Sequence, residues 1–398
     1  MTGTAIVAGG SIGGLFAANA LRAKGWDVRL YERSPVELAG RGAGIVTHDK
    51  LIAALETVGA STRDIGVALE DRVAFAKDGS VAHRIHLPQI VTSWDRMYQV
   101  LRRNFPDDRH HLGRSVEKFT QTADGVRVDF AEGGSAEADL LVGADGFRSN
   151  VRAQMLPDVV PQFSGYVVWR ALVSEADFPD DLRDSVFPHF GFFLPRGNQI
   201  IAYPIAGPDN DLRPGHRRYN FVWYSRVAEA ELAQMLTDAD GVRHSLTIPP
   251  PKVRDDLLAA MFADAERDLA EPFVRILDKS ERPFFTPIYD HHSPIMGQGR
   301  VALSGDAACV ARPHVGMGVT KAAEDAVTLA ECVTEHGVID GLAAYSEIRV
   351  PASMKAHQLA RDLGKQIFEA GEEGSNTDGR SHPAWEWAMK TTAVYPED

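Results

Sequence analysis

Glycines and one carboxylate near the start of the chain have the spacing of a dinucleotide-binding site. An apolar stretch, residues 5–8, runs into a glycine turn and then into a helix that stops at Gly25. The turn consists of Gly9, Gly10, Ser11, Ile12, Gly13 and Gly14. A phosphate binds where such a turn meets a helix, because unpaired amides and the helix dipole both favour negative charge there. A second strand, residues 27–31, ends at Glu32, whose position suits a carboxylate that binds a ribose hydroxyl.

Ser11 stands where this motif usually has its middle glycine. The backbone passes close to the pyrophosphate at that point, and a small side chain still allows the approach. Gly9 can form the tight turn, and Gly14 lets the helix pack closely on the strand. The pattern predicts a dinucleotide site, and the alternative is an ordinary strand–turn–helix unit.

A second acid follows a buried strand in the middle of the chain. Residues 140–142 are apolar and lead into Asp145 and Gly146, with Ser149 as the N-cap of a helix. An acid at the carboxyl end of a parallel strand lies in the crevice where open α/β sheets bind ligands. The alternative for Asp145 is a cap of the local turn.

The same order of strand, acid, glycines and helix recurs near the far end. A strand is expected at residues 300–304, followed by Gly305 and Asp306. A loop rich in glycine follows, and small residues at helical spacing predict a helix over residues 319–334. We therefore expect this region to return to the sheet that the opening turn belongs to.

Composition sets the broad class. The chain has 398 residues, of which 44% are hydrophobic, enough for two domains or one elaborate α/β body. A net charge of −13 argues against nucleic acid or an anionic membrane as a partner. No run approaches the roughly 18 apolar residues of a membrane span, and the start leaves no room for a cleaved signal peptide. Cys309 and Cys332 indicate neither a disulfide framework nor a metal site. We expect a cytoplasmic protein without a metal.

The middle of the chain has a different texture. From Gly165 on, strand-like stretches rich in aromatic and β-branched residues alternate with turns, and no helices separate them. This pattern predicts an inserted antiparallel sheet. Helical stretches follow at 232–236 and 253–277, with a break at three consecutive prolines.

Other elements are expected as follows. A β-meander is predicted at 116–119, 126–130 and 136–140, a helix at 94–104, two helical stretches at 341–349 and 352–370, a linker at 371–381 and a docked last segment at 383–389.

The three acid and glycine motifs together resemble those of the single-component FAD-dependent aromatic hydroxylases. The resemblance covers the chain up to about residue 370, and within the family residues 165–170 are most similar to the hydroxypyridine hydroxylases. It implies FAD-binding roles for Gly9, Gly10, Ser11, Ile12, Gly14, Glu32, Arg33, Arg41, Gly44, Asp145, Gly146, Gly305, Asp306, Gly316 and Gly318.

The resemblance also implies an α/β (α+β) fold: an FAD-binding Rossmann-like βαβ domain, an inserted antiparallel-sheet substrate domain and a C-terminal helical segment. The expected bounds are 1–72, 92–164 and 290–370 for the FAD-binding domain, 73–91 and 165–289 for the sheet domain, and 371–398 for the linker and C-terminal segment.

The chemistry implied by this family uses NADH or NADPH to reduce FAD. The reduced flavin then forms a C4a-hydroperoxide with O2, which hydroxylates a small, electron-rich aromatic or heteroaromatic ring of hydroxypyridine or phenol type. The flavin carries out the reduction and oxygen steps, so the protein needs no nucleophile triad, and the sequence shows none. We include a homodimer among the expected assemblies.

The ring-binding residues are predicted from the loop and sheet that the resemblance places at the reactive edge of the flavin. His314 after Pro313, and His48, are candidate bases because histidine accepts a proton near neutral pH. The alternatives are a structural histidine and a helix cap, respectively. Tyr203 and Trp223 are candidate substrate contacts, and the alternative for both is the core of the sheet.

The chain departs from the family pattern at three positions, one of which has Arg312 and Pro313 in place of a usual double proline. Cys309 replaces a usual histidine, and we expect it to be buried and unreactive. Trp94 stands where many members have an arginine against the flavin pyrophosphate. The candidates to replace that arginine are Arg33, Arg41, Arg96 and Arg102.

Two other functions compete with ring hydroxylation. A flavin-free NAD(P) dehydrogenase would need only one of the two later motifs, at Asp145 and at Asp306. The other alternative is a flavoprotein of the same fold that performs epoxidation or Baeyer–Villiger insertion.

Overall fold

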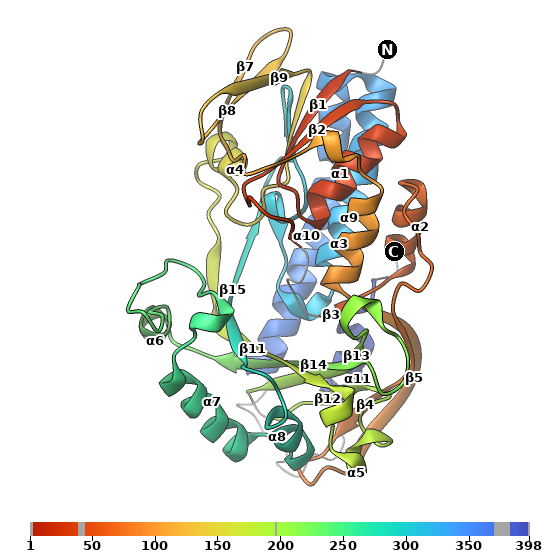
Figure 1. The fold of residues 1–398 in the computed structure, drawn as a ribbon, viewed down its shortest axis with the longest axis vertical. Helices are drawn as coiled ribbons and strands as arrows, with labels where there is room; N and C mark the ends of the chain where they lie inside the picture. The colour runs from red at the N-terminus through yellow and green to blue at the C-terminus, as the bar shows by residue number, and fades with distance from the viewer. Residues whose placement is uncertain (1–2, 39–43, 196, 370–382, 397–398) are drawn as a thin grey trace.

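Two large sheets and the helices around them make up the protein. The structure, a computed structural model, describes residues 3–38, 44–195, 197–369 and 383–396. A six-stranded sheet with its helices occupies the upper half of the view in Figure 1, and a nine-stranded sheet occupies the lower half. The chain crosses between them several times, so residues far apart in sequence meet where the two halves join.

The six-stranded sheet holds the three acid and glycine motifs. Its strand order is β16-β17-β10-β1-β2-β6, and all neighbours are parallel except β16 and β17. β1 and β10 lie at its centre and are almost entirely apolar, as expected for parallel strands buried on both faces. The bounds are β1 Thr4–Ala8, β2 Asp27–Glu32, β6 His110–Leu112, β10 Leu140–Gly143, β16 Gly297–Gln298 and β17 Val301–Leu303.

Small residues let two helices pack closely beside this sheet. The helix α1, Ile12–Ala23, lies against α9, Gly318–His336. A Cβ added at Gly13 would stand 3.5 Å from the Cβ of Ala322. The predicted recurrence of strand, acid and helix near the end of the chain is confirmed, because β17 joins the sheet beside β10 and α9 follows it.

The nine-stranded sheet confirms the predicted inserted sheet, with one difference. Its order is β18-β15-β11-β14-β13-β12-β4-β5-β3, and its pairs are antiparallel except β12 with β4. In the parallel pair, β12 lies beside β4, a strand of the early hairpin with β5. The bounds are β3 Gly44–Val46, β4 Val67–Phe75, β5 Val81–Ser93, β11 Gln162–Ser174, β12 Phe190–Phe193, β13 Gln199–Ile205, β14 Arg218–Arg226, β15 Phe284–His292 and β18 Cys309–Val310.

The two faces of the nine-stranded sheet have different neighbours. One face packs on α7, Asp255–Asp268, and α8, Glu271–Leu277, which lie along the bottom of Figure 1. The other face carries the side chains of Tyr203 and Tyr224 and packs on the C-terminal helices. Because side chains alternate along a strand, Trp223 belongs to the first face and its neighbour Tyr224 to the second.

One predicted interruption is wrong. The two helical stretches expected on either side of Pro351 form a single helix, α10, Val338–Glu369. Proline removes a helix hydrogen bond, but contacts on both sides hold the chain in place. Tyr345 Oη donates to the Leu303 carbonyl at 2.8 Å, and Ser353 Oγ lies 3.1 Å from Nε2 of His292.

The remaining elements follow the expectations closely. The meander of β7 Val116–Gln121, β8 Val126–Phe130 and β9 Ser135–Ala138 is confirmed, and so are the helix at 94–104 and the docked last segment. The other helices are α2 Asp49–Thr57, α3 Trp94–Arg103, α4 Asn150–Met155, α5 Asp180–Arg183, α6 Glu229–Met235 and α11 Pro383–Thr391. Within the described residues, no helix is long and apolar enough to cross a bilayer. The predicted linker at 371–381 lies outside the described residues.

Candidate active site

The glycines of the opening turn are required by its geometry. Gly9 has a φ of +104°, and a Cβ there would stand 2.3 Å from the Ala144 carbonyl oxygen. A Cβ at Gly14 would stand 1.8 Å from the Gly9 carbonyl oxygen. Ser11 is the N-cap of α1, yet its side chain makes no capping hydrogen bond. The first turn of α1 therefore offers its amides to a ligand, as a phosphate site needs.

Glu32 lies directly beside this turn. Its carboxylate accepts from the Gly10 amide at 2.7 Å and from the Ser34 amide at 2.8 Å. The side chain is buried at the carboxyl end of β2, where the sheet meets the turn. This is the position predicted for a carboxylate that binds a ribose hydroxyl.

Asp145 combines the two roles considered for it. It caps α4, accepting from Ser149 Oγ at 2.5 Å and from the Asn150 amide at 2.8 Å. It also lines the pocket beside Gly146. Burial raises the pKa of the Asp145 carboxyl above its ordinary value, and the bond from Ser149 acts against that rise.

The three motifs surround one pocket of about 690 Å³. Seven of the predicted cofactor residues line it: Gly9, Ser11, Glu32, Arg33, Asp145, Gly146 and Asp306. Gly10 and Gly14 shape the turn behind it, Ile12 begins α1, and Gly305 places Asp306. Gly44, Gly316 and Gly318 lie elsewhere, toward the nine-stranded sheet or at the start of α9. Arg41 lies outside the described residues.

The arginines near the pocket divide into two groups. Arg96 donates to the Arg63 carbonyl at 2.6 Å, and Arg102 is paired with Glu37 at 3.0 Å, so both are engaged away from the pocket. Arg33 lines the pocket and is exposed. Two further arginines that the sequence analysis did not consider, Arg114 and Arg148, also line it, as does Trp94.

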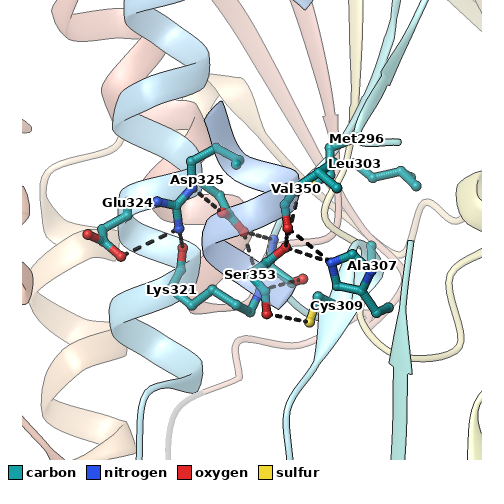
Figure 2. A network of polar contacts seen from close by, with 12 residues as sticks. Met296, Leu303, Ala307, Cys309, Lys321, Glu324, Asp325, Val350 and Ser353 are labelled. Atoms are coloured by element: carbon teal, nitrogen blue, oxygen red, sulfur yellow. Dashed lines mark hydrogen bonds and ion pairs between the residues drawn. The ribbon is translucent and has the colours of Figure 1, made fainter. Parts of the chain in front are cut away.

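A buried ion cluster lies behind the Gly305–Asp306 loop, and the sequence analysis missed it. Lys321 and Asp325, one helical turn apart on α9, are 3.3 Å from each other and almost fully buried (Figure 2). Lys321 Nζ donates to the Gly305 carbonyl at 2.9 Å, and the Gly305 amide donates to Asp325 at 3.1 Å. Arg349 of α10 adds a bond to Asp325 at 2.8 Å. The sequence does contain a signal for this cluster: a Lys and an Asp four residues apart on the face of α9 that carries small residues.

The basic residues of the cluster remain charged although they are buried. Burial disfavours the charged form of Lys321, but the Asp325 carboxylate keeps the pKa of Lys321 above its ordinary value. In the same way, Asp325 and Glu324 raise the pKa of Arg349 against the effect of burial. The cluster therefore fixes the loop that carries Asp306.

Arg152 joins the loops of the two later motifs. It is buried, and its guanidinium donates to the Phe147 carbonyl at 2.7 Å and to the Ala307 carbonyl at 3.2 Å. Its third neighbour is Nε2 of His291, at 3.1 Å. Arg152 is the third residue of α4, the helix after Gly146, and bridges from there to the loop at Asp306.

The predicted base candidates are both buried histidines. His314 is fully buried, its Nε2 lies 2.8 Å from Tyr166 Oη, and its ring is 4.2 Å from that of Tyr224. Burial lowers the pKa of His314 to about 3, with Arg312 acting in the same direction. Nδ1 of His48 lies 2.8 Å from Thr320 Oγ1, and burial lowers the pKa of His48 to about 4. Both are neutral at pH 7.

The alternative for His48, a helix cap, is correct for its position in the backbone but not for its side chain. His48 occupies the N-cap position of α2, but its side chain makes no capping bond and turns to α9 instead. The tight-loop alternative for His314 also fits, since Pro313 and His314 lie in the short turn of Pro313–Val315 before α9.

Tyr203 and Trp223 lie on opposite faces of the sheet. Tyr203 stacks on Phe190 at 4.7 Å, and a Cβ at Gly44 would stand 2.5 Å from its ring. Burial raises the pKa of Tyr203 to about 12. Trp223 packs toward α7 and α8 and donates to Asn198 at 3.2 Å. Tyr203 thus shares a face of the sheet with the C-terminal helices, and Trp223 lies on the face that packs on α7 and α8.

Cys309 is buried, as predicted. Its side chain is inaccessible, and burial raises the pKa of its thiol to about 12. A thiol with so high a pKa is unreactive at neutral pH. Within the described part of the chain, no three side chains form a group suited to a metal ion.

Comparison with known families gives two matches. Residues 2–187 and 288–360 match a family described as "FAD binding domain". Residues 163–290 match one described as "FAD binding domain-like".

Several characterised proteins are similar over nearly the whole chain. A 2,6-dihydroxypyridine 3-monooxygenase of Paenarthrobacter nicotinovorans is 35% identical over 390 residues, covering 96% of this chain and 95% of that one. An aurachin C monooxygenase/isomerase of Stigmatella aurantiaca is 31% identical, covering 93% and 89%. The solved structure of 2,6-dihydroxypyridine-3-hydroxylase from Arthrobacter nicotinovorans superposes with a TM-score of 0.88 at 31% identity, covering 96% and 98%. The resemblance and the fold class predicted from sequence are thereby confirmed.

Proposed function

The chain belongs to the FAD-dependent aromatic-ring monooxygenases, and we propose that it hydroxylates an electron-rich ring of hydroxypyridine or phenol type with NADH or NADPH and O2. The observation that carries the proposal is the single pocket at which Glu32, Asp145 and Asp306 meet. The names of the relatives support the ring class: they act on a dihydroxypyridine and on hydroxybenzoates. A cytoplasmic location and a homodimeric assembly belong to the same proposal.

The residues of the pocket fit FAD. The uncapped first turn of α1 suits the pyrophosphate, Glu32 suits the ribose of the adenosine half, and Asp306 suits the ribityl chain. Arg33, Arg114 and Arg148 replace the charge that the family pattern would place at Trp94. When bound, FAD accepts a hydride and reacts with O2 so that one oxygen atom reaches the ring.

The protein's own contribution is a dry, aromatic face for the ring. Tyr166, Tyr203 and Tyr224 are buried on the face of the nine-stranded sheet that is turned away from α7 and α8. A face without water protects reactive oxygen chemistry from hydrolysis.

The neutral histidines are the candidates for hydrogen bonding to a ring hydroxyl. With a pKa of about 3, His314 is a neutral imidazole at pH 7, with one protonated and one unprotonated ring nitrogen, and its Nδ1 has no partner among the described residues. We assign His314 to contact the ring hydroxyl and Tyr166 to orient His314 through the bond between Oη and Nε2. His48 is the second candidate, since Thr320 fixes its ring beside the start of α9.

The experiment uses the FAD-loaded protein, a panel of hydroxypyridines and phenols, and 18O2. We expect one class of ring to stimulate oxidation of NADH or NADPH and to yield a product that carries one 18O atom by mass spectrometry. The measurement of mass is essential because ring analogues can stimulate oxidation without being hydroxylated. A protein that oxidises NADH and NADPH but leaves every ring unlabelled would refute the proposal.

A further inference from the structure

A second cleft lies where the end of α10 meets the nine-stranded sheet. It has a volume of about 610 Å³ and shares no lining residue with the nucleotide pocket. Its wall comes from the start of β11, the end of β14, the loop before Pro313 and residues of α10 between 358 and 368. Neither FAD nor the proposed ring chemistry uses this basic cleft.

Four basic side chains line the basic cleft, and one carboxylate lines it with them. The basic residues are Arg226, Arg312, Arg361 and Lys365, and the acid is Asp362, which accepts from the side-chain amide of Gln358 at 2.9 Å. The whole chain carries a net charge of −13, so this concentration of positive charge is a local feature. A cleft lined by one sign of charge raises the local concentration of ligands of the opposite sign.

One carboxylate behind the wall is shared by several of these groups. Asp290, buried near the end of β15, binds Arg312 at 2.6 Å and lies 3.7 Å from Arg361 and 3.7 Å from Nε2 of His357. Burial would raise the pKa of Asp290, but His357 and Arg312 lower it to about 2, so it is ionised at pH 7. Asp290 and Asp362 together still leave the four basic side chains in excess at this wall.

A bulge in β11 adds neutral donors to the same wall. The pairing of β11 with β15 passes from Phe163 directly to Val167, so the residues between them bulge out of the ladder. Gly165 has a φ of +84°, which glycine adopts without strain. The hydroxyl of Ser164 is buried and has no hydrogen-bond partner among the described residues, although the residue lines the cleft. Bulges of this kind redirect side chains and are common beside binding sites.

The floor of the basic cleft is the back of the loop that carries His314. A Cβ at Gly364 would stand 3.1 Å from Nη1 of Arg312, 3.4 Å from Nε2 of His314 and 3.4 Å from Oη of Tyr166. The ring of Phe368, another lining residue, lies 4.6 Å from that of Tyr166. A ligand in the cleft would therefore lie behind the hydrogen bond between Tyr166 and His314.

We propose that the basic cleft is a second ligand site, which binds a small molecule through a carboxylate or phosphate group. The planar guanidinium groups of arginine match both groups with paired hydrogen bonds. The volume lies within the range of about 300–1,000 Å³ that is usual for small-molecule sites. The group could come from the phosphates of NADH or NADPH or from an organic acid. Only the first of these sources rests on the proposed function.

Two exposed arginines can be changed without touching the loop at His314. R361M removes an ion pair of 3.7 Å to Asp290, and R226M removes a hydrogen bond to the Phe368 carbonyl. Arg267 of α7 lies on the opposite side of the sheet and is paired with Asp264 at 2.7 Å, so R267M is the matched control. All variants are used as full chains loaded with FAD.

The measurement is isothermal titration calorimetry at low ionic strength, with inorganic phosphate, benzoate and NAD⁺ as probes. We expect phosphate to bind the wild type and R267M with the same dissociation constant. R361M and R226M should each weaken it about tenfold, because each loses one charged donor. No saturable binding of phosphate by the wild type, or equal constants in R361M and R267M, would overturn the proposal.

Competition identifies the source of the group. Displacement of phosphate by NAD⁺, weakened in R361M, assigns the cleft to the nicotinamide dinucleotide. Displacement by benzoate but not by NAD⁺ assigns it to an organic acid. Both results support the site.

The chain itself offers a competing occupant, the carboxylates of residues 369–382 and 397–398. A variant in which every Glu and Asp of these two stretches is replaced by Gln or Asn tests this occupant. If phosphate binds to that variant but not to the wild type, a carboxylate of the chain fills the cleft and the proposal is overturned. Failure of ring hydroxylation is read separately, from 18O in the product without added anion.

Discussion

Replacing Asp325 with asparagine should loosen the FAD site from behind without touching it. Asp325 is fully buried and binds Lys321 at 3.3 Å, Arg349 at 2.8 Å and the Gly305 amide at 3.1 Å. Asparagine keeps the size and one acceptor oxygen but removes the negative charge. Two cations then remain in a buried place, with Glu324, 3.4 Å from Arg349, and the carboxyl of Asp306 near Lys321 to balance them.

The size of the effect follows from those contacts. Removing one partner of a buried ion pair costs about 3–5 kcal/mol, because it leaves a charge without solvent or partner. Lys321 is 2% exposed and Arg349 is 7% exposed at the side chain, so water cannot compensate. We expect D325N to lower the free energy of unfolding by about 3–5 kcal/mol and to weaken FAD binding, since Gly305 loses its charged acceptor.

Two assays check this reasoning. Denaturant unfolding of the FAD-free chain gives the stability, and flavin fluorescence on titration gives the dissociation constant of FAD. The double variant D325N/K321M removes a buried charge of each sign, so it should be more stable than D325N alone. If D325N equals the wild type in both assays, or if the double variant is the less stable of the two, the cluster is not what fixes the loop.

Three further predictions test other parts of the site. G14A should fail to bind FAD or to fold, because its Cβ would stand 1.8 Å from a carbonyl oxygen; a yellow G14A protein would contradict the turn geometry. D306A should lower FAD occupancy at least tenfold, with the exposed D340A as control, and full flavin absorbance in D306A would exclude the ribityl role. Burial lowers the pKa of His314 and of His291 to about 3 and that of His48 to about 4, so the unfolded chain, with histidines near 6.5, takes up protons first. Stability should therefore be constant above about pH 7 and fall as the pH drops from 6.5 toward 4, by up to about 1.4 kcal/mol per pH unit for each histidine, and H314N should fall less steeply in urea titrations.

Local chemistry made the nucleotide half of the site predictable. Gly9, Gly14, Glu32 and Asp145 act through contacts within their own strand–turn–helix units or across adjacent strands, and such contacts leave a readable spacing in the sequence. The strand order follows from the same units, since parallel βαβ connections are constrained in hand and length. Pro351 is the exception, because contacts with β17 and β15 overrode a local signal.

The ring-binding half was harder to predict because its partners come from distant parts of the chain. Trp223 and Tyr224 are adjacent aromatic residues, and the placement of α7 and α8 decides which of them is covered by these helices. Arg72 looks in sequence like any strand arginine with alternating neighbours. It donates, however, to backbone carbonyls more than 300 residues later, at Met389 and Thr392. No periodicity connects positions so far apart.

The placement of charge in the two halves has a common physical reason. Behind the Asp306 loop, the cations Lys321 and Arg349 are balanced by the carboxylates of Asp325 and Glu324, so the cluster fixes the backbone while adding little field to the pocket. At the ring-binding face the titratable groups are neutral: His314 and His48 have low pKa values, and burial raises the pKa of Tyr203 to about 12. The charges that act on this face come from arginines: Arg312 acts with burial on the pKa of His314, and Arg170 opposes the rise in the pKa of Tyr203. An ionic interaction is weakened least in such buried surroundings, so a nearby arginine helps to keep His314 neutral.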